Sequence, residues 1–347
     1  MNFSTIVLQI FDKYDGERGR NAPFYVLQGK RSGQALQDAS YYSLFSYYHL
    51  LPDLHLGAYE QIIEQLLENK WIIVENERVQ VTDRGKEQLK KVEPLSFDGW
   101  TFRGREQIFF ERVLLLVQTA SYMKENVQRF EPIVRDITIQ QEVRQIYRRY
   151  PMHEEKYRHQ LRDELFDLLS PCSEIYQYLF TYKLTGYDRF GWTWTQLSRT
   201  LKQSQETLYL IWLSGLHQML HEIDEKKHFI LTALTEGVFQ QLAVTASAAR
   251  TYRYYQKGYT KEEIAYIRQL KESTIDDHFV EFAHYLPEFS ITPFVQEEHI
   301  REVEEVLKEE RTMRLRVLKE RLPHLTYFQI RLILGQQQKE RATWNVY

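Results

Sequence analysis

The chain has 347 residues, 43% of them hydrophobic and 14% aromatic, which is enough apolar material for the cores of two or three domains. The formal net charge of −3 at pH 7 excludes a protein that attracts nucleic acid through its overall charge. Any contact with DNA therefore has to come from a local basic patch. The single cysteine, Cys172, excludes an internal disulfide and fits a reducing cytoplasm.

Neither a membrane segment nor a secretory signal is visible in the sequence. The longest apolar run, residues 113–117, is far shorter than the roughly 20 residues that cross a bilayer as a helix. The N-terminus has an acidic residue by position 12 and no small-residue cleavage site. We expect a cytoplasmic, mostly α protein: several winged-helix or helix-turn-helix modules with short β-wings, joined by a helical middle region.

Residues 1–91 are predicted to form a winged-helix-like domain. Apolar spacing predicts helices over 3–14, 34–49 and 56–69, and alternation predicts a two-stranded wing over 71–74 and 78–82. The third helix, where base contacts lie in DNA-reading modules, carries Glu60, Glu64 and Glu68 and no Arg or Lys. Because these carboxylates would repel phosphates, we expect a protein-binding or purely structural domain.

A basic pair, Lys30 and Arg31, follows Gly29 in a segment that resembles a phosphate-binding loop. The motif is incomplete, because such a loop needs a glycine where this chain has Phe24, and no strand leads into it. A polar corner explains the segment. The pair stays a candidate contact for a nucleic-acid backbone or for the acidic tail of a partner.

The helical middle region, residues 92–180, contains a basic stretch. Long helices are predicted over 106–129, 138–150 and 153–169. Cations outnumber carboxylates between positions 129 and 162, and Arg144 and Arg148 share a helix face beside Tyr147. A solvated face explains the pattern, and a groove for phosphates or for an acidic peptide is the alternative. The candidate residues are Arg144, Arg148, Arg149, Lys156, Arg158 and Arg162.

Residues 181–245 repeat the winged-helix rhythm, with helices predicted from 195 and from Ser204, and a wing strand over 228–231. The second of these helices is mostly apolar, which favours packing or protein docking over DNA reading. His217 and His221 stand four residues apart, but Gln218 breaks the zinc-hydrolase pattern and no third ligand can be nominated. We expect no metal, no cofactor and no catalytic residues.

The last predicted domain, residues 246–347, has the rhythm of a helix-turn-helix. Gly258 ends one helix, Thr260 and Glu263 form a capping box for the next, and Ser273 is expected to cap the third. This third helix is expected to offer acidic residues to solvent, with only His278 and His284 as cations. It is therefore predicted to dock protein rather than DNA, through Thr274, Asp276, Asp277, His278 and Glu281.

A further long helix is predicted from residue 297, acidic at its start and basic toward its end, and stopped by Pro323. Its basic end supplies a second candidate patch, made of Arg311, Arg314, Arg316 and Lys319. Thr326 and Gln329 then predict a capped short helix, and the polar tail after it is expected to fray.

Two sets of motifs carry a family resemblance. The segments GYTKEEIAYIRQLKESTIDDHFVEF, ITPFV and LPHLTYFQIRLIL resemble the helix-turn-helix domain at the C-terminus of many RecQ-type DNA helicases. The segments GKRSGQALQDA and LLPDLHLGAYEQIIEQLLENKWI are similar to YpbB-type proteins of low-GC Gram-positive bacteria. The resemblance implies a non-enzymatic companion of a RecQ-type helicase in replication-fork maintenance or DNA repair. It also implies association with single-stranded-DNA-binding protein, and a place at the nucleoid when helicase or DNA is bound.

The leading hypothesis from sequence is an adaptor whose helix-turn-helix modules dock proteins, with at most weak contacts to the DNA backbone. The first alternative is a sequence-specific DNA-binding transcription regulator, which would bind a defined operator with steep salt dependence. The second is a sensor that holds a small ligand in the aromatic-rich middle region.

Overall fold

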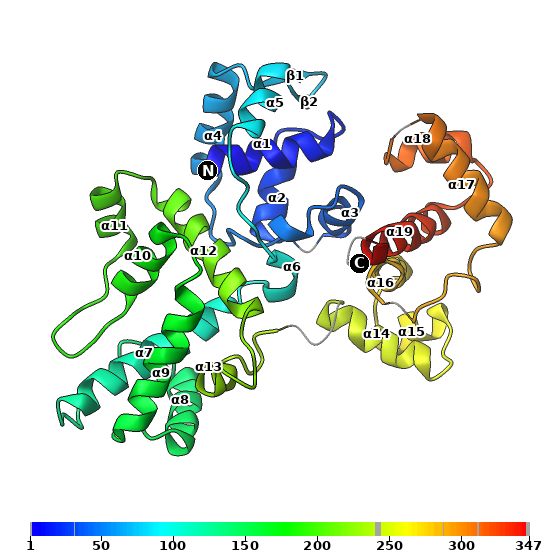
Figure 1. Cartoon of the computed structure of the whole chain (residues 1–347). Coiled ribbons are helices and arrows are strands. Elements are labelled where there is room, and N and C mark those ends of the chain that lie inside the picture. Colours follow the sequence, from blue (N-terminus) through cyan, green and yellow to red (C-terminus); the bar gives the residue numbers. More distant parts are fainter. Residues whose placement is uncertain (1, 31, 240–243, 287, 311, 345–347) are drawn as a thin grey trace.

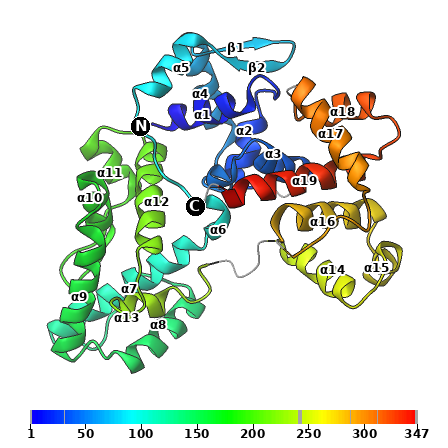
Figure 2. The same cartoon turned by 45° about the vertical axis from the view of Figure 1, so that its right-hand side comes forward.

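Helices dominate the structure, a computed structural model that describes residues 2–30, 32–239, 244–286, 288–310 and 312–344. They form an N-terminal group, a middle group and a C-terminal group, with the N-terminal group in contact with both of the others (Figures 1 and 2). The sequence prediction of a mostly α fold is confirmed. Within the described ranges, no helix is both long and apolar enough to cross a bilayer.

The N-terminal group combines helices with a β-hairpin. Its core is formed by α1 and α4, where Ile10, Phe11, Tyr59 and Ile63 are buried. The helix predicted over 34–49 is shorter than expected, because Ser43 has the left-handed φ of 53° that ends a helix. The elements are α1 (Phe3–Tyr14), α2 (Ala22–Gln28), α3 (Gly33–Tyr41), the 3-10 helix η1 (Phe45–Tyr47), α4 (Leu56–Glu68), β1 (Ile72–Glu75), β2 (Arg78–Val81) and α5 (Asp83–Lys90).

The hairpin confirms the wing predicted in the first domain. β1 and β2 are antiparallel, with Ile72 opposite Val81 and Glu75 opposite Arg78. Between them Asn76 and Glu77 both have positive φ, at 49° and 64°, which is the backbone of a tight hairpin turn that matches the strand twist.

The middle group is a bundle of helices. Helix α12 packs against both α7 and α10, so helices from the predicted middle region and from the predicted second winged-helix domain share one bundle. Phe110, Phe180 and Trp212 meet edge to face in its core, with Phe110 5.0 Å from Trp212 between ring centres. The elements are α6 (Gly99–Phe102), α7 (Glu106–Lys124), α8 (Ile137–Arg149), α9 (Glu155–Leu169), α10 (Glu174–Lys183), α11 (Trp194–Leu201), α12 (Gln205–His221) and α13 (Phe229–Leu234).

The prediction of a second wing strand over residues 228–231 is wrong. His228 is the N-cap of helix α13, which begins at Phe229. The cause lies in α9, where the buried Glu164 accepts backbone hydrogen bonds from Ile230 at 3.1 Å and from Leu231 at 2.9 Å. A carboxylate in this position satisfies amides of the first helical turn and complements the helix dipole. The described residues contain one sheet, the two-stranded hairpin of the N-terminal group.

The C-terminal group is organised around α16, which packs against α14, α15 and α19. The capping box of Thr260 and Glu263 is confirmed, with Thr260 donating its N–H to Glu263 at 2.8 Å. The N-cap of α16 is Lys271, so the predicted cap at Ser273 is wrong by two positions. The elements are α14 (Ala246–Gln256), α15 (Lys261–Arg268), α16 (Glu272–Tyr285), α17 (Glu297–Glu310), α18 (Leu315–Arg321) and α19 (Tyr327–Trp344).

The long helix predicted from residue 297 is instead two helices, α17 and α18, that pack against each other. The Arg321 side chain reaches from the end of α18 to the carboxylates of Glu309 and Glu310 at the end of α17. The sequence predicted that acidic and basic residues would complement the dipole of a single helix. In the structure, ion pairs between such residues connect α17 and α18 instead. The capped helix at Thr326 and Gln329 is confirmed, and it continues to Trp344, into the tail that was expected to fray.

The C-terminal group is joined to the N-terminal group through α19 and α16. Figure 2 shows α19 lying across α16 with one end beside α3, and α19 contacts both helices. Phe45 of η1 meets Tyr285 of α16 edge to face, with 5.3 Å between ring centres. The middle group is joined to the N-terminal group through α12, where the Thr207 hydroxyl accepts a hydrogen bond from the backbone N–H of Phe3 in α1 at 3.4 Å.

Candidate nucleic-acid interface

Helix α16 occupies the position of a reading helix, but it is the central helix of its group. Ile275, Phe279 and Phe282 are fully buried, and each residue from 274 to 285 is buried or half-buried. Only the first turn, at Glu272 and Ser273, is exposed. A reading helix needs one face free to enter the major groove. Beyond its first turn, α16 has no such face.

The predicted docking residues on α16 have partners inside the protein. The expectation that the acidic residues of α16 face solvent is wrong for Glu281, which is buried, whereas the side chain of Asp277 is still 44% exposed. Asp276 pairs with Lys261 and Asp277 with Arg331, and Thr274 is half-buried. Glu281 is buried and accepts hydrogen bonds from the backbone N–H and hydroxyl of Thr245. The partners come from α15, α19 and the segment before α14, so the spacing within α16 could not indicate them.

The histidines of α16 do not act as cations at neutral pH. His278 shares a 2.8 Å hydrogen bond with the Thr251 hydroxyl, and burial lowers its pKa to about 4. Burial also lowers the pKa of His284 to about 3, with the charge of Arg331 acting in the same direction. The carboxyl group of Glu281 shifts the other way, because burial raises its pKa to about 7. The buried part of α16 thus offers no positive charge to a phosphate.

Helix α4 is the predicted reading helix of the N-terminal domain, and its exposed face is acidic, as the sequence predicted. Glu60, Glu64 and Glu68 are all exposed, and the helix contains no Arg or Lys. A row of exposed carboxylates repels a DNA backbone.

The basic residues predicted in the middle region divide into free and paired side chains. Arg144, Arg148 and Arg149 are exposed on α8, and Arg149 lies over the ring of Tyr150. The others have partners close by: Lys156 pairs with Glu154, Arg158 donates to the carbonyls of Met152 and His153, and Arg162 pairs with Asp163. Three arginines on one helix are therefore without an ion pair among the described residues, whereas Lys156 and Arg162 are exposed and form surface pairs of the kind that contribute little in water.

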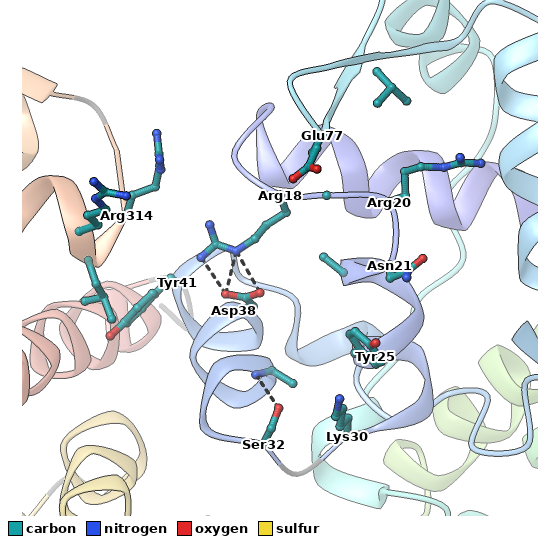
Figure 3. Close-up of a pocket in the computed structure, with 16 residues that line it drawn as sticks. Arg18, Arg20, Asn21, Tyr25, Lys30, Ser32, Asp38, Tyr41, Glu77 and Arg314 are labelled. Atoms are coloured by element: carbon teal, nitrogen blue, oxygen red, sulfur yellow. Dashed lines mark hydrogen bonds and ion pairs between the residues drawn. The ribbon is translucent and has the colours of Figure 1, made fainter. Parts of the chain in front are cut away.

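The structure brings together cations that the sequence placed in two separate patches. Lys30 of the N-terminal group lines the same cleft as Arg314 and Arg316, at the start of α18 (Figure 3). The volume of this cleft is about 910 Å³. Lys319 does not reach it, because its ammonium group donates to the carbonyls of Pro323 and Leu325. Two further predicted residues, Arg31 and Arg311, lie outside the described residues.

Sequence reasoning missed three residues of the cleft: Arg18, Arg20 and Tyr25. Arg18 is held by Asp38, with its Nε 3.0 Å from both carboxylate oxygens, so it forms part of the floor. The signal available in the sequence was the pair of arginines in the glycine-containing loop at positions 16–20. In the fold this loop and Lys30 lie on the same side of the cleft (Figure 3).

The histidine pair considered as metal ligands is held by Asp98. The backbone N–H of Asp98 donates to His217 at 3.0 Å, and its carboxylate lies 3.0 Å from Nε2 of His221. The hydrogen bond to Asp98 raises the pKa of His221. Among the residues that the structure describes, no group of three or more His, Cys, Asp or Glu side chains could hold a metal ion.

Residues 247–334 match a protein family described as a helix-turn-helix domain. This match and the fold define the molecule as a predominantly helical protein with a C-terminal helix-turn-helix domain. The whole chain is similar to Protein YpbB of Bacillus subtilis (strain 168), with 27% identity over 347 residues that cover 96% of this chain and 97% of that protein. No solved structure matches the chain.

Proposed function

We propose that the protein is a non-enzymatic adaptor that associates with a RecQ-type DNA helicase in replication-fork maintenance or DNA repair. The observation that carries the adaptor role is the burial of α16, which leaves its helix-turn-helix domain without a helix face for reading duplex DNA. The helicase is the partner because the C-terminal motifs resemble the domain that ends many RecQ-type helicases. Single-stranded-DNA-binding protein is a second proposed partner on the same basis.

The neighbouring helix α15 supplies the docking surface in this proposal. Tyr266 is 85% exposed and Ile267 is 42% exposed, and Tyr259, just before the helix, is also exposed. Tyrosine is enriched in protein–protein interfaces because it combines a large apolar ring with a polar tip. We therefore assign the protein-docking role to α15 rather than to α16, for which the sequence predicted it.

Co-purification tests the proposal. The tagged full chain is mixed with the RecQ-type helicase of its own organism, with and without nuclease, and the expected result is a complex under both conditions. Tyr266→Glu should weaken it, because a charge at the centre of an interface loses its hydration. Phe190→Glu is the matched control, since Phe190 is 79% exposed on a distant loop. No complex under either condition would refute the adaptor role.

The alternative of a sequence-specific transcription regulator requires a reading helix with a free face that tolerates phosphates. Beyond its first turn α16 has no free face, and the free face of α4 is acidic. Recovery of a consensus sequence in a binding selection from random DNA duplexes would support the transcription-regulator alternative. Thermal shifts with a panel of metabolites test the sensor alternative, since a bound ligand stabilises the folded state.

A further inference from the structure

The cleft between the N-terminal group and α18 has one side on each group. Arg20 and Lys30 lie on one side, and Arg314 projects from the other (Figure 3). The sides are held together by Glu17, whose carboxylate accepts hydrogen bonds from the Tyr42 hydroxyl at 2.5 Å and from the backbone N–H of Met313 at 3.3 Å. The cations therefore line one cleft whose two sides are connected.

Three of the cations in this cleft are available to a ligand. Arg20, Lys30 and Arg314 form no ion pair with any residue in the described ranges, whereas Arg18 is paired with Asp38. Arg316 is exposed and pairs with Glu320 on its own helix, a contact of the kind that contributes little in water. Helix α3 also begins at the cleft, at Ser32, and the positive end of its dipole favours an anion there.

The cleft also contains an aromatic ring beside these charges. Tyr25 is 36% exposed, and the Lys30 ammonium group lies over its ring, 3.9 Å from the ring centre. A base that stacks on this face takes the place of the ammonium group, which then turns to a phosphate. The exposed Val74 of the wing adds an apolar surface to the lining. Cations that follow a backbone, combined with an aromatic ring on which a base can stack, are the features of sites for single-stranded nucleic acid.

We propose that this cleft binds a single strand of nucleic acid, with its phosphates on Arg20, Lys30 and Arg314 and a base stacked on Tyr25. A single strand is favoured over a double helix, because the bases of a duplex are stacked on one another and are not free to stack on Tyr25. The aromatic ring favours a nucleic acid over an acidic peptide, which has carboxylates but no bases. The inference stands on the cleft alone and goes beyond the helicase partnership.

Fluorescence anisotropy on the full chain, without any helicase, tests it. The probe is a labelled oligo-dT of about twenty nucleotides, compared with a blunt duplex of the same length and with poly-glutamate as competitor. Lys30→Glu and Arg314→Glu should each weaken binding about tenfold or more. Each lost phosphate contact should also lower the slope of log K against log salt by about 0.7. A variant that is only misfolded would lose affinity without this decrease of about 0.7 in the salt slope for each lost contact.

Tyr25→Ala should weaken binding about tenfold with the salt slope unchanged, and Tyr25→Phe should retain most of the affinity, because stacking requires the ring and not the hydroxyl. Lys226→Glu is the charge-matched control, since Lys226 is exposed in the middle group and outside the cleft. Arg148→Glu tests the remaining patch on α8 in the same assay.

Equal weakening by Lys226→Glu and Lys30→Glu would overturn the proposal. So would duplex binding as tight as that of the single strand, or poly-glutamate binding in the absence of any binding to oligo-dT. Circular dichroism and thermal unfolding check the fold of each variant. Lys30→Gln and Arg314→Gln replace the charge reversals if those fail to fold. Because no helicase is present, failure here leaves the adaptor proposal standing.

Discussion

Ser40 and His284 are 244 residues apart in the chain, yet they share a buried hydrogen bond with 2.5 Å between the Ser40 hydroxyl oxygen and Nδ1 of His284. The bond joins α3 to α16 and thereby the N-terminal group to the C-terminal group. Nε2 of the same ring is buried without a hydrogen-bond partner among the described residues. The junction therefore depends on a neutral imidazole, because a second proton on this ring would be buried without an acceptor.

This junction predicts an acid-sensitive stability. The pKa of His284 falls from its ordinary 6.5 to about 3 on folding, so between these pH values the unfolded chain binds a proton that the folded protein does not. The contribution of His284 to stability is therefore present above pH 6.5 and is lost progressively as pH falls from 6.5 to about 3. His278, with a pKa of about 4, acts in the same direction. Glu281 acts oppositely, because its contribution declines as pH rises from 4.5 to about 7.

Urea unfolding at several pH values checks the role of His284. His284→Gln should be less stable than the wild type at pH 7, and the difference should shrink by about 2 kcal/mol at pH 5, because the variant has no imidazole to protonate. His55→Gln is the control, since His55 is exposed. A difference that stays constant with pH would contradict a neutral, buried imidazole.

Glu164 is predicted to hold the start of α13. Glu164→Gln removes the negative charge that accepts the amides of Ile230 and Leu231, and it should cost about 1–2 kcal/mol. Hydrogen exchange at those two amides should accelerate more than exchange elsewhere in the bundle. Glu155→Gln on the exposed face of α9 should leave stability and exchange near wild-type values.

Arg112 is predicted to be the most costly arginine to replace in the middle group. Its side chain is 7% exposed, it pairs with Glu142, and it donates to the carbonyls of Leu234 and Glu236 at the end of α13. Arg112→Met leaves these acceptors unsatisfied and should destabilise the fold by about 3–5 kcal/mol in chemical denaturation. Arg148→Met, at an exposed position on α8, should change stability by less than about 0.5 kcal/mol. Similar losses in both variants would contradict this assignment.

Gly215 of α12 is predicted to be required for the close approach of α10. A Cβ atom at this position would lie 2.2 Å from the ring of Tyr176, which is itself fully buried. Gly215→Ala should therefore destabilise the fold by about 1–3 kcal/mol, measured by thermal unfolding. In contrast, Gly57→Ala in α4 meets nothing within 4 Å and should stabilise by up to about 1 kcal/mol. Tyr176→Leu should suppress most of the effect at Gly215.

Features encoded by neighbouring residues were predictable from the sequence. The capping box at Thr260 depends on a glutamate three residues away, and the first wing depends on alternation within about ten residues. The strand predicted at 228–231 was wrong because Glu164, more than sixty residues earlier, determines that segment as a helix. Local apolar content could not distinguish the two outcomes.

The candidate site was predictable only in part for the same reason. Lys30 and Arg314 were each identified as basic positions, but nothing in the spacing of either segment indicates that they line one cleft. The acidic residues of α16 were expected to be exposed because α15 and α19, which supply Lys261 and Arg331, could not be placed against α16 from the pattern. Tertiary contacts between distant segments decide which charges are free.

Helix α19 contacts α3, so the last described helix completes a surface of the first group. During translation the N-terminal helices leave the ribosome long before this segment is made. Tyr41 and Ser40 then lack the covering that His284 and α19 give them in the finished protein. A chain truncated before residue 272 would lack both α16 and α19 and would leave this face of α3 open to chaperones and proteases. The N-terminal group is therefore fully covered only after the C-terminal group has been synthesised.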